Sequence, residues 1–180
     1  MDRPKLLGIA GALRRGSTNR KLLAEAVRLF GPAEVMPGDI AMPLYDGDLE
    51  DASGLPEAAE RLVAQCRAAD AIVIATPEYN KSIPGVLKNA LDWVSRARPG
   101  ALRDKPLAIM SASDGRYGGE RSQFALRLTL VPFRPDLLQG PEVLVGFSLE
   151  AFDAAGRLTD ERALKALTEL MALLRKRAGF

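Results

Sequence analysis

The 180-residue chain contains no histidine and only one cysteine, Cys66. Without histidine, the Ser-His-Asp and Cys-His catalytic arrangements are excluded, and so are histidine-bearing zinc sites. A single cysteine permits no intramolecular disulfide, which fits a reducing compartment. Any chemistry must therefore depend on carboxylates, lysine, arginine, tyrosine, hydroxyl groups or a bound cofactor.

The sequence also lacks a large excess of charge of either sign and has no long apolar run. Lys and Arg total 25 against 23 for Asp and Glu, and the net charge of +2 is too small to indicate a dedicated nucleic-acid binder. No stretch approaches the roughly 20 apolar residues of a membrane span. The short apolar run near the N-terminus is not followed by a small-residue cleavage site. We therefore expect a cytoplasmic protein with no membrane span and no nucleic-acid partner.

The length and composition indicate one folded domain. With 47% hydrophobic and 27% charged residues, the chain has the composition of an ordinary globular protein. Its length suffices for one sizeable core, and no repeat or low-complexity tract divides it. The prediction is a single domain over residues 1–180.

Short apolar runs alternate with segments of helical spacing along the chain. The clearest strand, Asp70–Thr76, is apolar at the consecutive positions 71–75, as expected when both faces of a parallel sheet are covered. The segment Pro37–Gly54, with several Pro, Gly and Asp residues, is predicted to be irregular. The expected strands are Lys5–Ala10, Ala33–Met36, Asp70–Thr76, Leu107–Met110 and Glu142–Val145; the expected helices are Thr18–Phe30, Pro56–Ala69, Pro84–Ser95, Gly119–Val131 and one capped by Thr159 that ends in Arg175–Arg177.

This alternation predicts a parallel sheet with helices on both faces, because each crossover between parallel strands needs a covering segment. Ligands of such sheets bind at the C-terminal ends of the strands. The loops that could carry chemistry are therefore residues 11–18, 76–84 and 111–119.

The first of these loops, Gly11–Asn19, contains hydroxyls, an amide and two arginines between a strand and a helix. Free N–H groups and the positive end of the helix dipole favour an anion there, and Arg14 or Arg15 can add charge-assisted hydrogen bonds. The loop is neither a GxGxxG nor a Walker sequence. A phosphate site is one interpretation; the other is that Ser17 or Thr18 only caps the helix while the arginines are solvated.

The second loop, Thr76–Gly85, offers an aromatic ring, an amide, a hydroxyl and backbone N–H groups within a few residues. A flavin ring needs flat apolar contact together with donors and acceptors along one edge, and this loop could provide both. Its prolines, Pro77 and Pro84, limit how far it can move.

The run from Thr76 to Trp93 reads TPEYNKSIPGVLKNALDW and resembles the signature of the NADPH-dependent FMN reductase family. The first loop resembles the phosphate loop of that family, Ser-x-Arg-x-x-Ser-x-Asn, except that Ala12 stands where the family usually has Ser. The stretch Ser111–Gly119 is similar to its glycine-rich third loop. The resemblance thus extends over nearly the whole chain.

The resemblance implies a flavodoxin-like fold with a five-stranded parallel sheet in the order 2-1-3-4-5. It implies bound FMN, reduction by NADPH or NADH, and a small acceptor such as a quinone, chromate, an azo compound or free flavin. Family members are often homodimers or homotetramers, and no catalytic side chain is assigned. The implied FMN-binding residues are Arg14, Ser17, Thr18 and Asn19 at the phosphate, Pro77, Glu78, Tyr79, Asn80 and Ser82 along the ring, and Ser113, Gly115 and Gly118 on the other side.

Several residues near these loops have a structural interpretation. Glu78 is expected to accept backbone hydrogen bonds in its turn, and Cys66 is expected to be an inert core residue. The signature residues Lys88, Asn89, Asp92 and Trp93 are expected to be structural or interfacial. A non-enzymatic FMN-binding electron carrier or redox sensor remains the alternative, although carriers of this kind are typically acidic.

Overall fold

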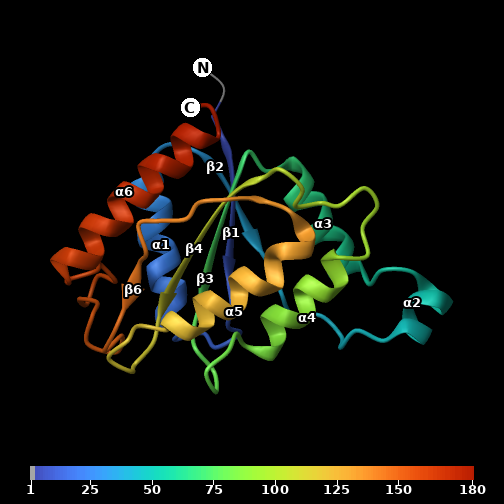
Figure 1. Ribbon diagram of the computed structural model, residues 1–180, viewed down its shortest axis with the longest axis horizontal. Coiled ribbons are helices and arrows are strands. Elements are labelled where there is room, and N and C mark those ends of the chain that lie inside the picture. The colour runs from blue at the N-terminus through green and yellow to red at the C-terminus, as the bar shows by residue number, and fades with distance from the viewer. Residues whose placement is uncertain (1–2) are drawn as a thin grey trace.

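A parallel β-sheet forms the middle layer of the structure, a computed structural model that describes residues 3–180 (Figure 1). The strand order β2-β1-β3-β4-β5 confirms the predicted order, and all pairings are parallel. The strands are β1 (Lys5–Ala10), β2 (Glu34–Gly38), β3 (Ala71–Thr76), β4 (Pro106–Ala112), β5 (Asp136–Leu137) and β6 (Leu144–Val145).

The edge beyond β4 differs from the prediction. The strand expected at Glu142–Val145 is present only as β6, and a strand that was not predicted, β5, precedes it. Both β5 and β6 pair with β4, so the sheet has six strands rather than five. Between them Gly140-Pro141 interrupts the pairing, since proline has no backbone N–H to donate. The last backbone hydrogen bond to β4 before the interruption runs from the N–H of Leu138 to the carbonyl of Leu107. The first one after it runs from the N–H of Ser111 to the carbonyl of Val143.

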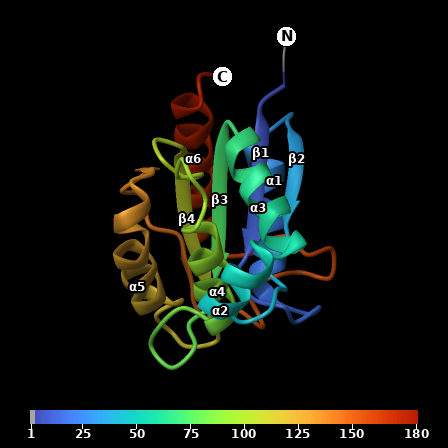
Figure 2. The same cartoon turned by 90° about the vertical axis from the view of Figure 1, so that its right-hand side faces the viewer.

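Helices cover both faces of the sheet, which Figure 1 shows edge-on between them. Figure 2, turned by 90°, looks onto one of these covered faces. Their apolar residues form two clusters, one with α1 and α6 and the other with α3, α4 and α5. Every residue of β3 is buried between the clusters, as predicted for a central strand. The bounds are α1 (Thr18–Phe30), α3 (Glu57–Ala68), α4 (Gly85–Val94), α5 (Glu120–Leu130) and α6 (Glu161–Arg177). The cap of α6 is Asp160 rather than the predicted Thr159.

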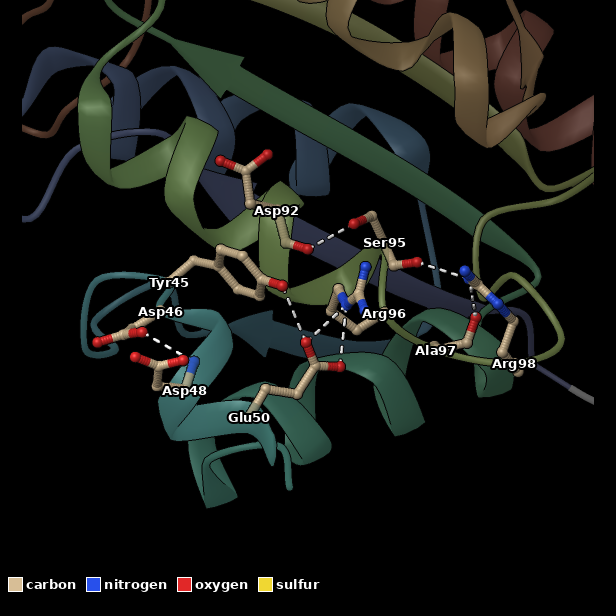
Figure 3. Close-up of polar contacts among 9 residues, drawn as sticks. All are labelled: Tyr45, Asp46, Asp48, Glu50, Asp92, Ser95, Arg96, Ala97 and Arg98. Carbon is tan, nitrogen blue, oxygen red and sulfur yellow. Dashed lines mark hydrogen bonds and ion pairs between the residues drawn. The ribbon is translucent and has the colours of Figure 1, made fainter. Parts of the chain in front are cut away.

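A helix that was not predicted, α2 (Gly47–Ser53), lies inside the segment expected to be irregular. None of its residues is buried, so it lacks the apolar periodicity that marks the other helices. Asp46 caps it by accepting from the N–H of Asp48. In Figure 3 the hydroxyl of Tyr45 donates to Glu50 (2.9 Å), and Nε of Arg96, just beyond α4, donates to both Glu50 oxygens. The ion pair with Arg96 therefore ties α2 to the segment that follows α4.

The carboxylate of Glu25 on α1 is buried against two arginines. Arg28 binds it through two hydrogen bonds of 3.0 Å, and Arg157, in the segment between β6 and α6, binds it through one of 2.8 Å. The hydrogen bonds from Arg28 are the largest cause that lowers the pKa of Glu25; burial opposes them, and Arg157 lowers the pKa further. The cluster ties the C-terminal part of the chain to the first helix.

We expect Glu25→Gln to lower the free energy of unfolding at pH 7 by about 2 kcal/mol, because it removes charge-assisted bonds inside the fold. The folded-state pKa lies below the unfolded value, so the contribution of Glu25 is fully present above the unfolded pKa and is lost as the pH falls through the folded one. Urea unfolding at pH 7 and at about pH 3, below the ordinary pKa of a glutamate, should therefore show a smaller difference between wild type and variant in acid. The exposed Glu169 provides the control, since Glu169→Gln should change little at either pH. A loss of equal size at both values would contradict the assignment.

Candidate active site

A pocket of about 240 Å³ opens at the C-terminal ends of the strands, the edge from which the loop after β3 projects in Figure 1. Four loops meet there, those that follow β1, β3, β4 and β6. The lining residues are Arg14, Gly16, Ser17, Thr18, Asn19, Pro77, Glu78, Tyr79, Ala112, Ser113, Asp114, Ser148 and Leu149. The sequence therefore predicted correctly that the first three loops come together.

The first loop presents an anion-binding arrangement at the start of α1. Ser17 caps the helix, its Oγ accepting from the N–H of Asn19 (3.2 Å), and the first turn carries no acidic residue. Arg14 is exposed and forms no ion pair within residues 3–180. The helix dipole and the free guanidinium both favour a negative ligand. Capping and anion binding are thus compatible here.

Asn19 joins the first loop to β4. Its Nδ2 donates to the carbonyl of Ala112 (2.7 Å), and its Oδ1 accepts from the N–H of the same residue (3.0 Å). The side chain is buried and both ends of its amide are engaged. Asn19 therefore fixes the distance between the first and third loops.

The second loop contributes Pro77, Glu78 and Tyr79 to the pocket, and Tyr79 is 51% exposed. Beyond Tyr79 the chain reverses in a two-residue turn, in which Tyr79 and Ser82 exchange both backbone hydrogen bonds (2.9 and 3.0 Å). The central residues Asn80 and Lys81 have φ of 50° and 66°, as a type I′ turn requires. Asn80 and Ser82, both predicted at the flavin edge, lie outside the residues that line this pocket.

The carboxylate of Glu78 accepts no hydrogen bond from the described residues 3–180, so the expected contacts with its own turn are not formed. The third loop contributes Ser113 and Asp114 to the lining. Two predicted residues of this loop, Gly115 and Gly118, do not line the pocket. Gly118 instead packs against β6: a Cβ there would lie 2.6 Å from the carbonyl carbon of Leu144, and its φ is +61°.

The sequence interpretation missed Ser148 and Leu149, which follow β6. A usable signal was present, because β6 overlaps the predicted fifth strand and its C-terminal end opens at the same edge of the sheet. Asp114 was also missed, although its neighbour Ser113 was predicted. Ala12, at the position where the resemblance fails, is buried and does not line the pocket.

The structural interpretation of Asn89, Trp93 and Cys66 is confirmed. Nδ2 of Asn89 and Nε1 of Trp93 both donate to the carbonyl of Pro43 (2.9 and 2.8 Å), and Oδ1 of Asn89 accepts from the N–H of Tyr45 (2.8 Å). These bonds fasten the segment before α2. Burial raises the pKa of Cys66 to about 12, so its thiol is unreactive.

Among residues 3–180, no group of three or more His, Cys, Asp or Glu side chains is placed to hold a metal ion. Within the same residues no helix is both long and apolar enough to cross a bilayer.

A parallel sheet in this order, with a cationic, hydroxyl-bearing loop after β1 beside an aromatic-bearing loop after β3, is typical of the flavodoxin-like class of nucleotide-binding proteins. The family model of NADPH-dependent FMN reductases matches residues 4–150. The chain belongs to that family, which confirms the resemblance seen in the sequence and the prediction of an oxidoreductase that uses FMN and NADPH or NADH.

Individual relatives agree with this assignment. An NAD(P)H-dependent FMN reductase of Pseudomonas aeruginosa is 46% identical over 175 residues, which cover 96% of this chain and 94% of that protein. A quinone reductase of Escherichia coli is 37% identical over 172 residues, 93% and 91% of the two chains. Among solved structures, the flavoenzyme NAD(P)H:(acceptor) oxidoreductase FerB of Paracoccus denitrificans superposes with a TM-score of 0.87 at 31% identity, covering 98% of this chain and 97% of that one.

Proposed function

We propose that this protein takes reducing equivalents from NADPH or NADH and passes them through bound FMN to a quinone or another small acceptor. The pocket itself is the observation that carries the proposal. On one side lies the first loop, with Arg14 and two hydroxyl groups at the N-terminus of α1, and on the other lies the second loop with the half-exposed Tyr79. Chromate, azo compounds and free flavin are further acceptors of suitable size. The name of the E. coli relative favours a quinone.

The distribution of charge in the pocket indicates which end of FMN would lie where. Arg14 and the hydroxyls of Ser17 and Thr18 belong to the first loop, whereas the carboxylates Glu78 and Asp114 belong to the second and third loops. A phosphate dianion would therefore lie against the first loop, at the N-terminus of α1. The arrangement fits a ligand that carries a phosphate at one end.

The size of the pocket and the exposure of Tyr79 indicate where the ring would lie. Pockets that enclose a drug-sized ligand have volumes of about 300–1,000 Å³, and this pocket of about 240 Å³ is smaller. We infer that it encloses the phosphate end, and that the ring extends along Pro77 and Tyr79, with one face open to a second molecule. Bound FMN would supply the redox chemistry, accepting hydride from the nicotinamide and giving electrons to the acceptor. The protein would fix the ring through the turn at Tyr79–Ser82.

The visible spectrum of the purified protein tests this function. We expect a yellow protein with oxidised flavin absorption, which NADPH or NADH bleaches rapidly under anaerobic conditions and which a quinone then restores. Stopped-flow mixing distinguishes the enzyme from the alternative. A flavoprotein that nicotinamide nucleotides reduce only very slowly would be an electron carrier or redox sensor, and a protein that binds no flavin would contradict both.

We also propose that the protein is a homodimer or homotetramer that associates through α5. Phe124, Leu128 and Val131 follow one another at helical spacing, and each is more than half exposed. Tyr117, in the third loop just before α5, is also largely exposed. Contiguous exposed apolar side chains of this kind mark interaction sites, and one helix face meeting its own copy gives a closed two-fold interface.

Light scattering coupled to size-exclusion chromatography tests the association. We expect wild type to elute as a dimer or tetramer and Leu128→Asp to elute as a smaller species, because the new carboxylate would be desolvated at the interface. Leu44 is 81% exposed on another part of the surface, so Leu44→Asp is the matched control and should keep the wild-type mass. A monomeric wild type would contradict the proposal.

The cytoplasm is the proposed location. It supplies NADPH and NADH, and its reducing conditions suit a chain with a single thiol. The small net charge supports the proposal that no nucleic acid is among the partners.

A further inference from the structure

The segment Gly146–Leu149 brings Ser148 and Leu149 to the pocket from outside the three loops that the sequence motifs mark. It follows β6, whose parallel pairing with β4 brings it to the same edge of the sheet as the third loop. The N–H of Ser113 donates to Val145 O (3.0 Å), and the N–H of Ser148 donates to Ser113 O (3.2 Å). Backbone bonds thus fasten this fourth loop to the third on both sides of Gly146 and Phe147.

The backbone of the fourth loop is held in an unusual conformation. Phe147 has a φ of 45°, in the left-handed region that a residue with a side chain rarely adopts. A Cβ at Gly146 would lie 2.6 Å from the carbonyl oxygen of Arg116, so only glycine allows this close approach. Such a conformation persists when the surroundings determine it, and it often occurs at binding sites. Here it places the next residue, Ser148, in the pocket.

Two serine hydroxyls of the pocket, those of Ser17 and Ser148, retain hydrogens for a ligand. The hydroxyl of Thr18 donates to Oγ of Ser148 (3.1 Å), and with that bond the hydrogen of Ser148 has no acceptor among residues 3–180. Oγ of Ser17 accepts from a backbone N–H, so its hydrogen is equally unused within those residues. Ser148 is only 3% exposed. A buried hydroxyl normally finds a partner, and a bound anion would accept from both serines.

We propose that Ser148 donates a hydrogen bond to the phosphate of the bound flavin nucleotide, beside Arg14 and Ser17. The inference rests on the function proposed above and adds a phosphate-binding residue from the fourth loop. The first loop has no hydroxyl at position 12, because the residue there is alanine and is buried. Ser148 supplies a hydroxyl from a distant part of the chain.

Parallel titrations with FMN and with riboflavin, which lacks the phosphate, test the assignment. Ser148→Ala should lower the affinity for FMN about tenfold and leave that for riboflavin within about twofold, as expected for one hydrogen bond to a charged group. Ser95→Ala is the matched control, since the hydroxyl of Ser95 donates to the carbonyl of Asp92 away from the pocket. Unchanged FMN affinity in Ser148→Ala, or an equal loss for both ligands, would overturn the proposal.

A second pair of variants separates the phosphate contact from an effect on folding. Ser148→Thr keeps a hydroxyl, and Ser148→Val has nearly the same shape as threonine without one. Only the valine variant should therefore show a preference for FMN over riboflavin that is reduced about tenfold. The assignment would be contradicted if both variants kept the wild-type preference. It would also be contradicted if both showed the same reduction. If wild type binds neither flavin, the function proposed above fails; if it prefers FMN and none of the Ser148 variants alters that preference, only the role of Ser148 fails.

Discussion

Arg14→Ala should weaken the binding of FMN by about 1.5–3 kcal/mol, the range measured for hydrogen bonds to charged groups. Arg14 lines the pocket from the loop that leads into α1 and has no carboxylate partner within residues 3–180. Its guanidinium would therefore be free to bind the phosphate. Fluorescence or calorimetric titration of the flavin-free protein measures the change.

The neighbouring residue provides the control for this prediction. Arg15 is exposed and does not line the pocket, so Arg15→Ala should leave the affinity for FMN almost unchanged. Riboflavin should bind the Arg14 variant as it binds wild type, because it has no phosphate to lose. A drop in riboflavin affinity with FMN affinity intact would show that the phosphate does not lie at the first loop.

Gly118→Ala should lower the free energy of unfolding by about 3 kcal/mol, through backbone strain and overpacking together. The added methyl carbon would lie 2.6 to 2.9 Å from backbone atoms of Leu144 and Val145, and a φ of +61° is unfavourable for alanine. Since the neighbours are backbone atoms of a paired strand, they cannot move aside as a flexible side chain would. Chemical denaturation of the flavin-free protein measures the loss.

Gly115 lies in the same loop and supplies the comparison. A Cβ there meets no atom within 4 Å, and its φ lies outside the left-handed region, so Gly115→Ala should be nearly neutral in stability. If Gly118→Ala and Gly115→Ala both kept wild-type stability but no longer bound FMN, the prediction would be wrong. Gly118 would then be needed for flavin binding rather than for its contact with β6.

The elements that the sequence predicted well are those with strong local patterns. The strand β1 and the helix α1 have the predicted bounds, because an apolar run and a capped amphipathic repeat each define their own limits. The three motif-bearing loops were found for a related reason, since each follows a recognisable buried strand. In β1, α1 and the three loops, the structure that the local sequence favours is therefore the structure that the fold requires.

The features that were missed depend on contacts between distant residues. The short helix α2 has no buried face and is held by Arg96 and Asn89, far along the chain, so its own residues give little helical signal. The edge strands β5 and β6 have two residues each, too few for any periodicity. Ser148 is an ordinary serine in sequence, and only the pairing of β6 with β4 brings it to Thr18.

The attachment of the fourth loop to the first and third loops bears on when the protein could acquire its cofactor during synthesis. The residues of the first loop leave the ribosome early, whereas Ser148 and the Arg157 that binds Glu25 are made much later. A nascent chain that ends before β6 would present Arg14 and Ser17 without the wall that closes the pocket. Flavin loading is therefore expected to follow synthesis of the chain through Arg157, and the cofactor would be incorporated once the segment after β6 has docked onto the first helix.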